Sequence, residues 1–180
     1  MIKKKKCKHC NELFTPYNSL QKYCQESECI KVWVDESKKK DWNKRKSQIK
    51  KDLMSLQDWL KIAQTHFNTF IRLRDEGNNC ISCGKKPLKK NAGHFFNANN
   101  HYNVRFDERN VHLQCEHCNT FLSGNLIPYR ENLIKKIGVK EFEKLSEIAN
   151  ETRKFTIEEV KQIAVEYKEK IQRRKKIYNN

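Results

Sequence analysis

A stripe of apolar side chains recurs every three or four residues between positions 53 and 74. This spacing predicts an amphipathic helix, and Gly77 follows as a helix-ending residue. The stripe consists of Leu53, Leu56, Leu60, Ala63, Phe67, Phe70 and Ile71. Because large apolar side chains at helical spacing are usually buried, we interpret the stripe as a core or dimer face rather than a ligand site. His66 has no evident partner in the sequence, and we expect it to be structural.

The same helical period returns beyond Pro128 and predicts two more amphipathic helices, divided near Gly138 and ending near Asn150. A last helix is predicted from about Thr156, where Thr-Ile-Glu-Glu matches a capping box. It ends in a basic run at 172–176. This part of the chain is therefore expected to be largely helical.

Residues 31–51 lack such an apolar period. They are polar, highly basic and free of Pro and Gly, which favours a solvated helix or helical linker. The segment is either a charged spacer or an arm that follows nucleic-acid phosphates. In the second case Trp33 and Trp42 could pack or stack, and the overall charge of the chain favours the arm.

Short apolar pieces at 93–96 and 111–114 predict two strands, joined through an Asn-rich loop at 97–103. We expect the chain to turn helical around Cys118. The central segment thus predicts two strands, a loop and one helix, and the fold class is α+β and mostly helical.

Eight cysteines occur in two groups of four, and each group suits one zinc ion. Four thiolates leave no open coordination position, so both ions are expected to be structural. Paired cysteines in a reducing compartment favour metal over disulfides. The groups are Cys7, Cys10, Cys24 and Cys29, and Cys80, Cys83, Cys115 and Cys118.

The chain has 38 Lys and Arg against 22 Asp and Glu, and its formal net charge of +16 predicts a polyanionic partner, most often nucleic acid. Charge alone leaves DNA, RNA and the ribosome open. A hydrophobic fraction of 37% predicts a thin core that metal sites would help to hold. No run approaches the length of a membrane span or forms a signal core, so we expect no membrane partner and a cytoplasmic protein.

Polar residues with catalytic potential lie between or beside the central cysteine pairs: His94, Asn110 and Asn119. An isolated histidine is more often structural, but the position of His94 between two Cys-x-x-Cys turns favours catalysis. The alternative role for Asn110 is that of an ordinary turn residue, and the alternative role for Asn119 is that of a helix cap. His9 and His117 lie inside Cys-x-x-Cys turns and are expected to be exposed.

These residues resemble the His-Me finger (HNH) nucleases, and nearly the whole chain resembles the phage NinG (Rap) family of recombination nucleases. The matching segments are 64–75, 80–84, 93–95, 105–115, 118–119, 123–125 and 129–130, together with the amino-terminal cysteine group. The resemblance implies a zinc-clamped ββα (His-Me finger) core with flanking helices and an amino-terminal zinc-knuckle module. The expected parts are 1–30 (four-cysteine zinc module), 31–77 (basic arm and amphipathic helix), 78–127 (nuclease core) and 128–180 (helices and basic tail).

The resemblance also implies roles for single residues. His94 would be the general base that deprotonates water, Asn110 would hold the loop backbone, and Asn119 would bind a catalytic Mg²⁺ or Mn²⁺ ion. Arg105, Arg109 and Arg130 flank these residues and are candidates for gripping the phosphate.

One position departs from the pattern of many HNH sites, which carry an acidic or histidine metal ligand just before the base. Here that position is Gly93. His112, His101 and Asp107 are open candidates for a second ligand. Because Mg²⁺ readily keeps several waters, Asn119 alone is also chemically sufficient.

The expected activity is metal-dependent cleavage of branched recombination intermediates, Holliday junctions and D-loops, in the cytoplasm of a bacterial host. Coordinated nicks in opposing strands require two active sites, so we expect a homodimer, with the helix at 53–74 as a possible contact. The alternative is a non-catalytic zinc protein that binds DNA or RNA.

Overall fold

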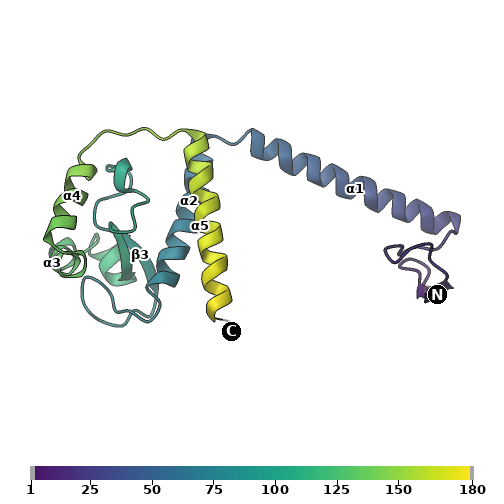
Figure 1. Ribbon diagram of the computed structural model, residues 1–180, viewed down its shortest axis with the longest axis horizontal. Coiled ribbons are helices and arrows are strands. Elements are labelled where there is room, and N and C mark those ends of the chain that lie inside the picture. Colours follow the sequence, from purple (N-terminus) through teal and green to yellow (C-terminus); the bar gives the residue numbers. More distant parts are fainter. Residues whose placement is uncertain (1–2, 179–180) are drawn as a thin grey trace. The chain divides into compact units, whose positions relative to one another are not determined.

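The computed structural model describes residues 3–178, with backbone only for the last two of them. The chain divides into two compact units between Met54 and Ser55, here called the N-terminal and C-terminal units. The strands and helices, drawn in Figure 1, are β1 (Lys5–Lys6), β2 (Leu13–Phe14), α1 (Ser27–Asp52), α2 (Leu56–Arg74), β3 (Lys90–His94), η1 (Tyr102–Val104), β4 (Val111–Cys115), η2 (His117–Phe121), α3 (Leu126–Ile137), α4 (Val139–Ala149) and α5 (Ile157–Tyr178). The mostly helical α+β class predicted from the sequence is confirmed.

The N-terminal unit is organised around its four cysteines. Strands β1 and β2 pair antiparallel, with Lys5 opposite Phe14, and form a hairpin at the start of the unit. Cys7, Cys24 and Cys29 are buried together with Tyr23. Helix α1 begins before Cys29, so residue 30, where the first part was expected to end, lies inside this helix. The small core is thus built from the ligand set itself.

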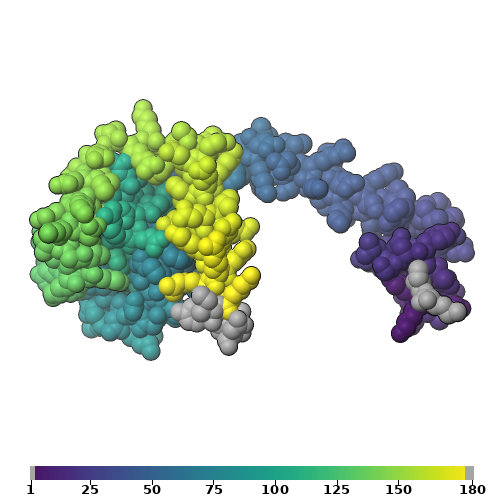
Figure 2. Space-filling model, in the orientation of Figure 1, coloured from purple at the N-terminus to yellow at the C-terminus, as the bar shows by residue number. Residues whose placement is uncertain are grey.

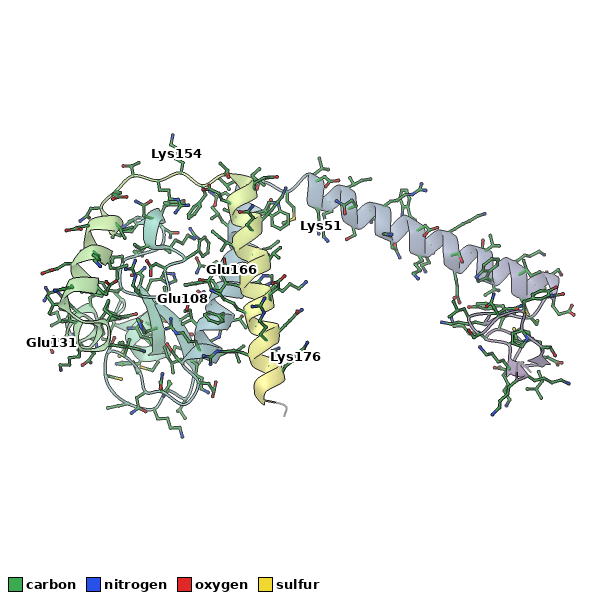
Figure 3. The ribbon with its side chains drawn as sticks, in the orientation of Figure 1. Lys51, Glu108, Glu131, Lys154, Glu166 and Lys176 are labelled. Atoms are coloured by element: carbon green, nitrogen blue, oxygen red, sulfur yellow. The ribbon has the colours of Figure 1, made fainter. Side chains whose placement is uncertain are left out.

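Beyond Cys29, α1 is a solvated helix. Cys29 is its only buried residue among those described, and the side chains stand out along the helix in Figure 3. Trp33 and Trp42 keep 53% and 63% of their surface exposed. The helix expected over residues 31–51 is confirmed.

Helix α2 opens the C-terminal unit with a capping box. Ser55 Oγ accepts from Asp58 N–H at 3.3 Å, and Asp58 Oδ2 accepts from Ser55 N–H at 3.1 Å. The helix therefore starts later than the apolar stripe suggested, and Leu53 stays 80% exposed outside it. The rest of the stripe is buried or partly buried, as predicted from its spacing.

Helix α5 covers the buried stripe of α2. It begins with the expected capping box, in which Glu159 N–H donates to Thr156 Oγ1 at 3.2 Å. The two helices lie side by side in Figure 1, and the yellow atoms of α5 fit closely against the teal atoms beside them in Figure 2. Phe67 contacts Tyr167 edge to face, at 4.8 Å between ring centroids. The stripe is therefore core, and its use as a dimer face is wrong because α5 already covers it.

The hairpin of β3 and β4 lies between the α2–α5 pair and the α3–α4 pair (Figure 1). In its antiparallel register Gly93 faces His112 and His94 faces Val111. The first strand ends at His94, earlier than the expected residue 96. Its two faces carry different groups: Val111 packs in the core with α2 and α5, whereas His112 approaches Tyr129 of α3.

The helix expected around Cys118 is only a single turn of π-helix, η2. Ser123, Gly124 and Asn125 follow with φ angles of 48°, 94° and 45°, and three successive left-handed residues cannot continue a helix. Helix α3 then starts before Pro128, which lies in its first turn, where a missing N–H costs no helical bond.

Helices α3 and α4 form the other layer of the unit. They meet at Gly138, whose φ of 86° breaks the helix where the sequence predicted a division. Tyr129, Leu133 and Leu145 are fully buried in this layer. Among the described residues, no helix has the length and apolar character needed to cross a membrane.

Candidate metal centres and candidate active site

The central four cysteines come together at the base of the β3–β4 hairpin. Their sulfur atoms all lie within 4.8 Å of one another, and the Sγ atoms of Cys83 and Cys115 are 3.8 Å apart. Four sulfurs at the usual zinc–sulfur distance of about 2.3 Å form a tetrahedron with edges of about 3.8 Å. A disulfide would need a separation of about 2.05 Å. The four thiols therefore fit one tetrahedral zinc ion.

Backbone and amide groups hold these sulfurs in place. Cys118 N–H donates to Cys115 Sγ at 3.4 Å, and Asn125 Nδ2 donates to Cys118 Sγ at 3.5 Å. Ile81 N–H donates to Leu113 O at 2.9 Å, which ties the first Cys-x-x-Cys turn to β4. Asn125, to which the sequence analysis gave no role, thus orients a metal ligand, and its left-handed backbone favours Asn at this position.

The amino-terminal cysteines form a second site of the same kind. Their sulfurs also lie within 4.8 Å, with Cys10 and Cys24 Sγ 3.7 Å apart. Burial raises the pKa of the Cys7 thiol, but N–H groups, among them Cys24 N–H at 3.3 Å, outweigh it and bring this pKa to about 6. In the same group, burial and the neighbouring thiols raise the pKa of Cys29, so the fit to zinc rests on the positions of the four sulfurs. Both expected zinc sites are therefore present as ligand sets.

His94 lies at the end of β3 with one ring nitrogen already engaged. Its Nε2 is 3.1 Å from the Arg105 carbonyl oxygen, and next to a carbonyl this nitrogen must be the N–H donor. The neutral tautomer then has Nδ1 as an acceptor. Burial lowers the pKa of His94 to about 4, against smaller opposing effects of the Arg105 and Ala92 carbonyls. The imidazole is thus neutral near pH 7 and able to accept a proton.

Gln64 on α2 lies beside both His94 and Arg105 and hydrogen-bonds to Arg105. Its Nε2 lies 3.5 Å from His94 Nε2 and donates to Asn68 Oδ1 at 2.8 Å, while its Oε1 accepts from Arg105 Nε at 2.9 Å. The sequence analysis gave Gln64 no role. In the sequence Gln64 stands out only as a polar residue next to Ala63, at the edge of the apolar stripe.

Arg105 is the candidate phosphate ligand that lies beside His94. Its guanidinium carbon is 5.8 Å from the Tyr102 ring and 5.7 Å from the Phe106 ring, and burial lowers its pKa. Only Nε has a hydrogen-bond acceptor among the described residues. The two terminal nitrogens therefore remain able to bind an anion.

The other two arginines have different surroundings. Hydrogen bonds to Asp107 and Glu141 raise the pKa of Arg109, and its guanidinium lies 2.7 Å and 2.8 Å from these carboxylates. Arg109 is thus engaged in ion pairs rather than free for a phosphate. Arg130 is exposed and lies 5.2 Å above the Phe142 ring.

Asn110 is fully buried and holds the loop between the strands. Its Oδ1 accepts from Phe96 N–H at 2.8 Å, and its Nδ2 donates to the carbonyls of Phe96 and Val104, each at 3.0 Å. Tyr129 adds a support that the sequence analysis missed, since its hydroxyl donates to Gly93 O at 2.9 Å. The backbone on both sides of His94 is therefore fixed.

Gly93 has a packing reason to be glycine. A Cβ at this position would overlap Gln114 Oε1. Gln114 is fully buried, and its Nε2 donates to Ser82 Oγ at 2.6 Å and to Gly124 O at 2.5 Å. The Gln114 side chain fills the space that a metal-binding side chain at position 93 would need.

The three open candidates for a second metal ligand differ in their surroundings. His112 is 3% exposed, and burial together with the charges of Lys136 and Arg74 lowers its pKa to about 3. His101 Nδ1 lies 2.8 Å from Ala149 O, and Asp107 pairs with Arg109. Asp107 is thus held by its ion pair and His112 by burial, whereas the Nδ1 contact of His101 leaves its Nε2 able to bind an ion.

Asn119 lies in the middle of η2 and is half-buried. Its side-chain amide forms no hydrogen bond with the described residues, nor does any contact join it to His94. An amide oxygen without a competing partner suits a hard cation that keeps most of its waters. His9 and His117 are exposed, as expected, and His66 Nδ1 lies 2.8 Å from Ala164 O in the α2–α5 contact.

Comparison with known proteins identifies the family of the chain. The family model described as "Bacteriophage Lambda NinG protein" matches residues 1–177. The chain belongs to the NinG family. The match includes both cysteine groups and every candidate site residue of this NinG-family chain.

Curated relatives extend over most of the chain. The Protein ninG of Escherichia phage 933W is 34% identical over 186 residues, covering 93% of this chain and 92% of the relative. The Protein ninG of Escherichia phage lambda is 44% identical over 114 residues, which cover 63% of this chain and 55% of the relative. That of Salmonella phage P22 is 43% identical over a similar length. No solved structure matches this NinG-family chain.

Proposed function

We propose that this NinG-family protein is a metal-dependent, structure-selective DNA endonuclease that cuts branched recombination intermediates. The observation that carries the proposal is the state of His94, whose Nε2–H is held by the Arg105 carbonyl while its neutral Nδ1 can accept a proton. In this proposal β3, β4 and η2 correspond to the ββα core of the His-Me finger nucleases. The short η2 turn replaces the longer helix of that pattern.

The reaction is hydrolysis of a phosphodiester, and this chain's residues have separate tasks in it. His94 Nδ1 takes a proton from the attacking water, a role that typically contributes about 10²–10⁴-fold to the rate. Arg105, oriented by Gln64, binds the phosphate through its terminal nitrogens. Asn110 keeps the loop that carries these groups in place.

Asn119 would hold a Mg²⁺ or Mn²⁺ ion, which stabilises negative charge on the phosphate oxygens when bound. Because the Gln114 side chain occupies the space next to Gly93, no side chain at position 93 can share that ion. Zinc ions bound at the two cysteine groups would be structural, since each group supplies four sulfur donors and leaves no open position.

Substitution of the base tests the proposal. The full-length, zinc-loaded His94→Ala variant should lose nicking of synthetic junctions in Mg²⁺ or Mn²⁺ by at least about 100-fold, because the proton acceptor is gone. Junction binding and zinc content should not change. His9→Ala, which removes an exposed histidine outside the site, serves as the matched control and should cut normally.

A second candidate function is a zinc protein that binds DNA or RNA without cutting, which the missing side chain at Gly93 favours. Salt-sensitive binding is common to both functions and does not separate them. Cutting by His94→Ala at the unsubstituted rate would disprove the assigned mechanism. Absence of cutting by the unsubstituted protein on junctions, forks and D-loops, with both ions, would favour the second function.

A further inference from the structure

A groove in the N-terminal unit lies between the zinc-knuckle loop and the first half of α1. Its volume is about 660 Å³, and its lining includes Tyr17, Leu20, Tyr23, Trp33 and Lys40. We propose that this groove binds a single strand of DNA, with bases stacked on Tyr17 and Trp33. The binding concerns unpaired nucleotides and does not require that the chain cut DNA.

Two aromatic rings of the groove present open faces. Tyr17 is 77% exposed and Trp33 is 53% exposed, whereas Tyr23 is 7% exposed and packs with the zinc-site cysteines beneath them. Exposed aromatic side chains beside positive charge are the recurring device for binding single strands, because every base offers a π face. In a duplex both faces of each base pair are covered, so stacking of this kind selects unpaired bases.

The loop that carries Tyr17 is held in shape by its own side chains. Gln21 Oε1 accepts from Tyr17 N–H at 2.7 Å, and Asn18 Oδ1 accepts from the N–H groups of Leu20 and Gln21 at 2.9 Å and 3.0 Å. The neighbouring cysteine group anchors both the loop and the start of α1. The two rings are therefore placed before a ligand arrives, which lowers the entropy lost on binding.

The side chains that line the groove carry a net positive charge, with three lysines and one carboxylate among them. The carboxylate, Glu36, is 2.9 Å from Lys8 Nζ and accepts from Tyr23 Oη at 2.7 Å, and these hydrogen bonds lower its pKa. Lys22 and Lys40 also line the groove and form no ion pair among the described residues. They are free to contact phosphates.

The positive charge continues along α1 beyond the groove. Residues 38–51 contain eight Lys and Arg and one Asp. Beyond the groove, charged and polar side chains predominate on α1, and the exposed Trp42 and Ile49 stand apart along the helix without forming a continuous apolar face for a protein partner. A flexible polyanion suits a groove with aromatic walls and a basic extension better than a peptide does. The choice of DNA over RNA rests on the proposed function, since the displaced strand of a D-loop exposes unpaired bases.

The test uses two tryptophans of the same helix. Binding of a fluorescently labelled 15-nucleotide oligo(dT) to the full-length, zinc-loaded protein is measured by anisotropy in Mg²⁺-free buffer at low salt. Trp33→Ala should weaken binding on the order of tenfold, because one stacking face is lost. Trp42→Ala is the matched control: this residue is similarly exposed on α1 but lies outside the groove, and its loss should change the affinity less than twofold.

Further variants and ligands separate stacking in the groove from a general effect of α1. Tyr17→Ala should match Trp33→Ala, and Trp33→Phe should recover most of the affinity, since an aromatic face is restored. Equal effects of Trp33→Ala and Trp42→Ala would overturn the proposal, as would an equal loss of affinity for a 15-base-pair duplex. A loss confined to oligo(U) would identify the ligand as RNA and also overturn it.

Folding and cleavage are followed separately. Zinc content and far-ultraviolet circular dichroism of each variant must equal those of the unsubstituted protein, and Trp33→Phe supports the comparison if Trp33→Ala fails to fold. If the unsubstituted protein cuts no DNA, and Trp33→Ala still weakens binding more than Trp42→Ala does, the proposed nuclease is contradicted and the proposed binding groove is supported. If the protein cuts junctions and the two variants bind equally well, the nuclease is supported and the groove is contradicted.

Discussion

The side chain of Gln64 on α2 lies close to the His94 imidazole. It lies between the imidazole and Arg105, and it adds no charge of its own. Burial therefore dominates the His94 pKa, which is about 4 instead of the usual value near 6.5. A histidine in this state keeps its base form in acid conditions where an exposed histidine has lost it.

The first prediction at this scale concerns the pH dependence of cleavage. Because a lowered pKa preserves neutral His94, kcat/KM for nicking should stay level as the pH falls from 8 to about 5.5. Gln64→Glu places a carboxylate beside the imidazole, favours the imidazolium and raises the His94 pKa. The acid limb of the profile should then move to higher pH.

A control and a contrary outcome complete this test. Gln162→Glu adds the same charge on the exposed face of α5 and should leave the profile in place. If Gln64→Glu lowers kcat/KM by one constant factor at every pH, Gln64 supports the fold and does not set the basicity of His94. An acid limb near pH 6.5 in the unsubstituted protein would contradict the burial of the base.

The roles of single residues were accessible from the sequence to different degrees. The cysteines and His94 could be assigned because their spacing along the chain carries the information. Gln64 and Tyr129 could not, because they reach the hairpin across 30 and 36 residues, through contacts that depend on tertiary packing. The sequence located Arg109 but did not reveal its ion pair, since its partner Glu141 lies on α4, 32 residues further along the chain.

At the scale of elements, the β3–β4 hairpin depends on the fit between Gly93 and Gln114. Alanine at position 93 would force the Gln114 side chain out of its place beside Ser82 and Gly124. We expect Gly93→Ala to reduce the free energy of unfolding by on the order of 1–3 kcal/mol, as overpacking usually does. Urea unfolding of the zinc-loaded protein measures the change.

A double-mutant cycle shows whether the two residues are coupled. In the Gln114→Ala background the added methyl group has room, so Gly93→Ala should cost much less there. Equal costs in the two backgrounds would mean that Gln114 is not the obstacle. The same fit explains why position 93 lacks a metal ligand, which the sequence alone presented as an unexplained departure.

The elements themselves followed from the sequence where a periodic pattern or a cap specified them. The capping box at Thr156 and the break at Gly138 were confirmed. The single turn of η2 was not foreseen, because the left-handed backbone at Ser123–Asn125 has no strong signature except its glycine. Leu53 fell outside α2 because the Ser55 cap, rather than the apolar period, determines where the helix begins.

At the scale of the whole molecule, each unit has its own cysteine group and should bind its own zinc ion. The full-length protein is expected to contain two zinc ions per chain. Cys10→Ser and Cys83→Ser form a matched pair, since each removes an exposed cysteine from one group. Each variant should retain one zinc ion, as measured by metal analysis of the purified protein.

The consequences of the two losses should differ. Cys83→Ser should abolish cutting, because the hairpin that carries His94 loses its clamp, whereas Cys10→Ser should leave the C-terminal unit folded. Thermal unfolding followed by circular dichroism separates the two cases. A single zinc ion in the unsubstituted protein would leave one of the two groups without its metal and contradict the two-site assignment.

The covering of α2 by α5 has a consequence for synthesis on the ribosome. Phe67 and Phe70 emerge early, but Tyr167, which covers both, follows about a hundred residues later. Domains fold as units when their parts are available, so the N-terminal unit can close on zinc while the C-terminal unit is still incomplete. A nascent chain that ends before α5 exposes an aromatic strip beside His94. The proposed nuclease therefore becomes active only after α5 has been translated.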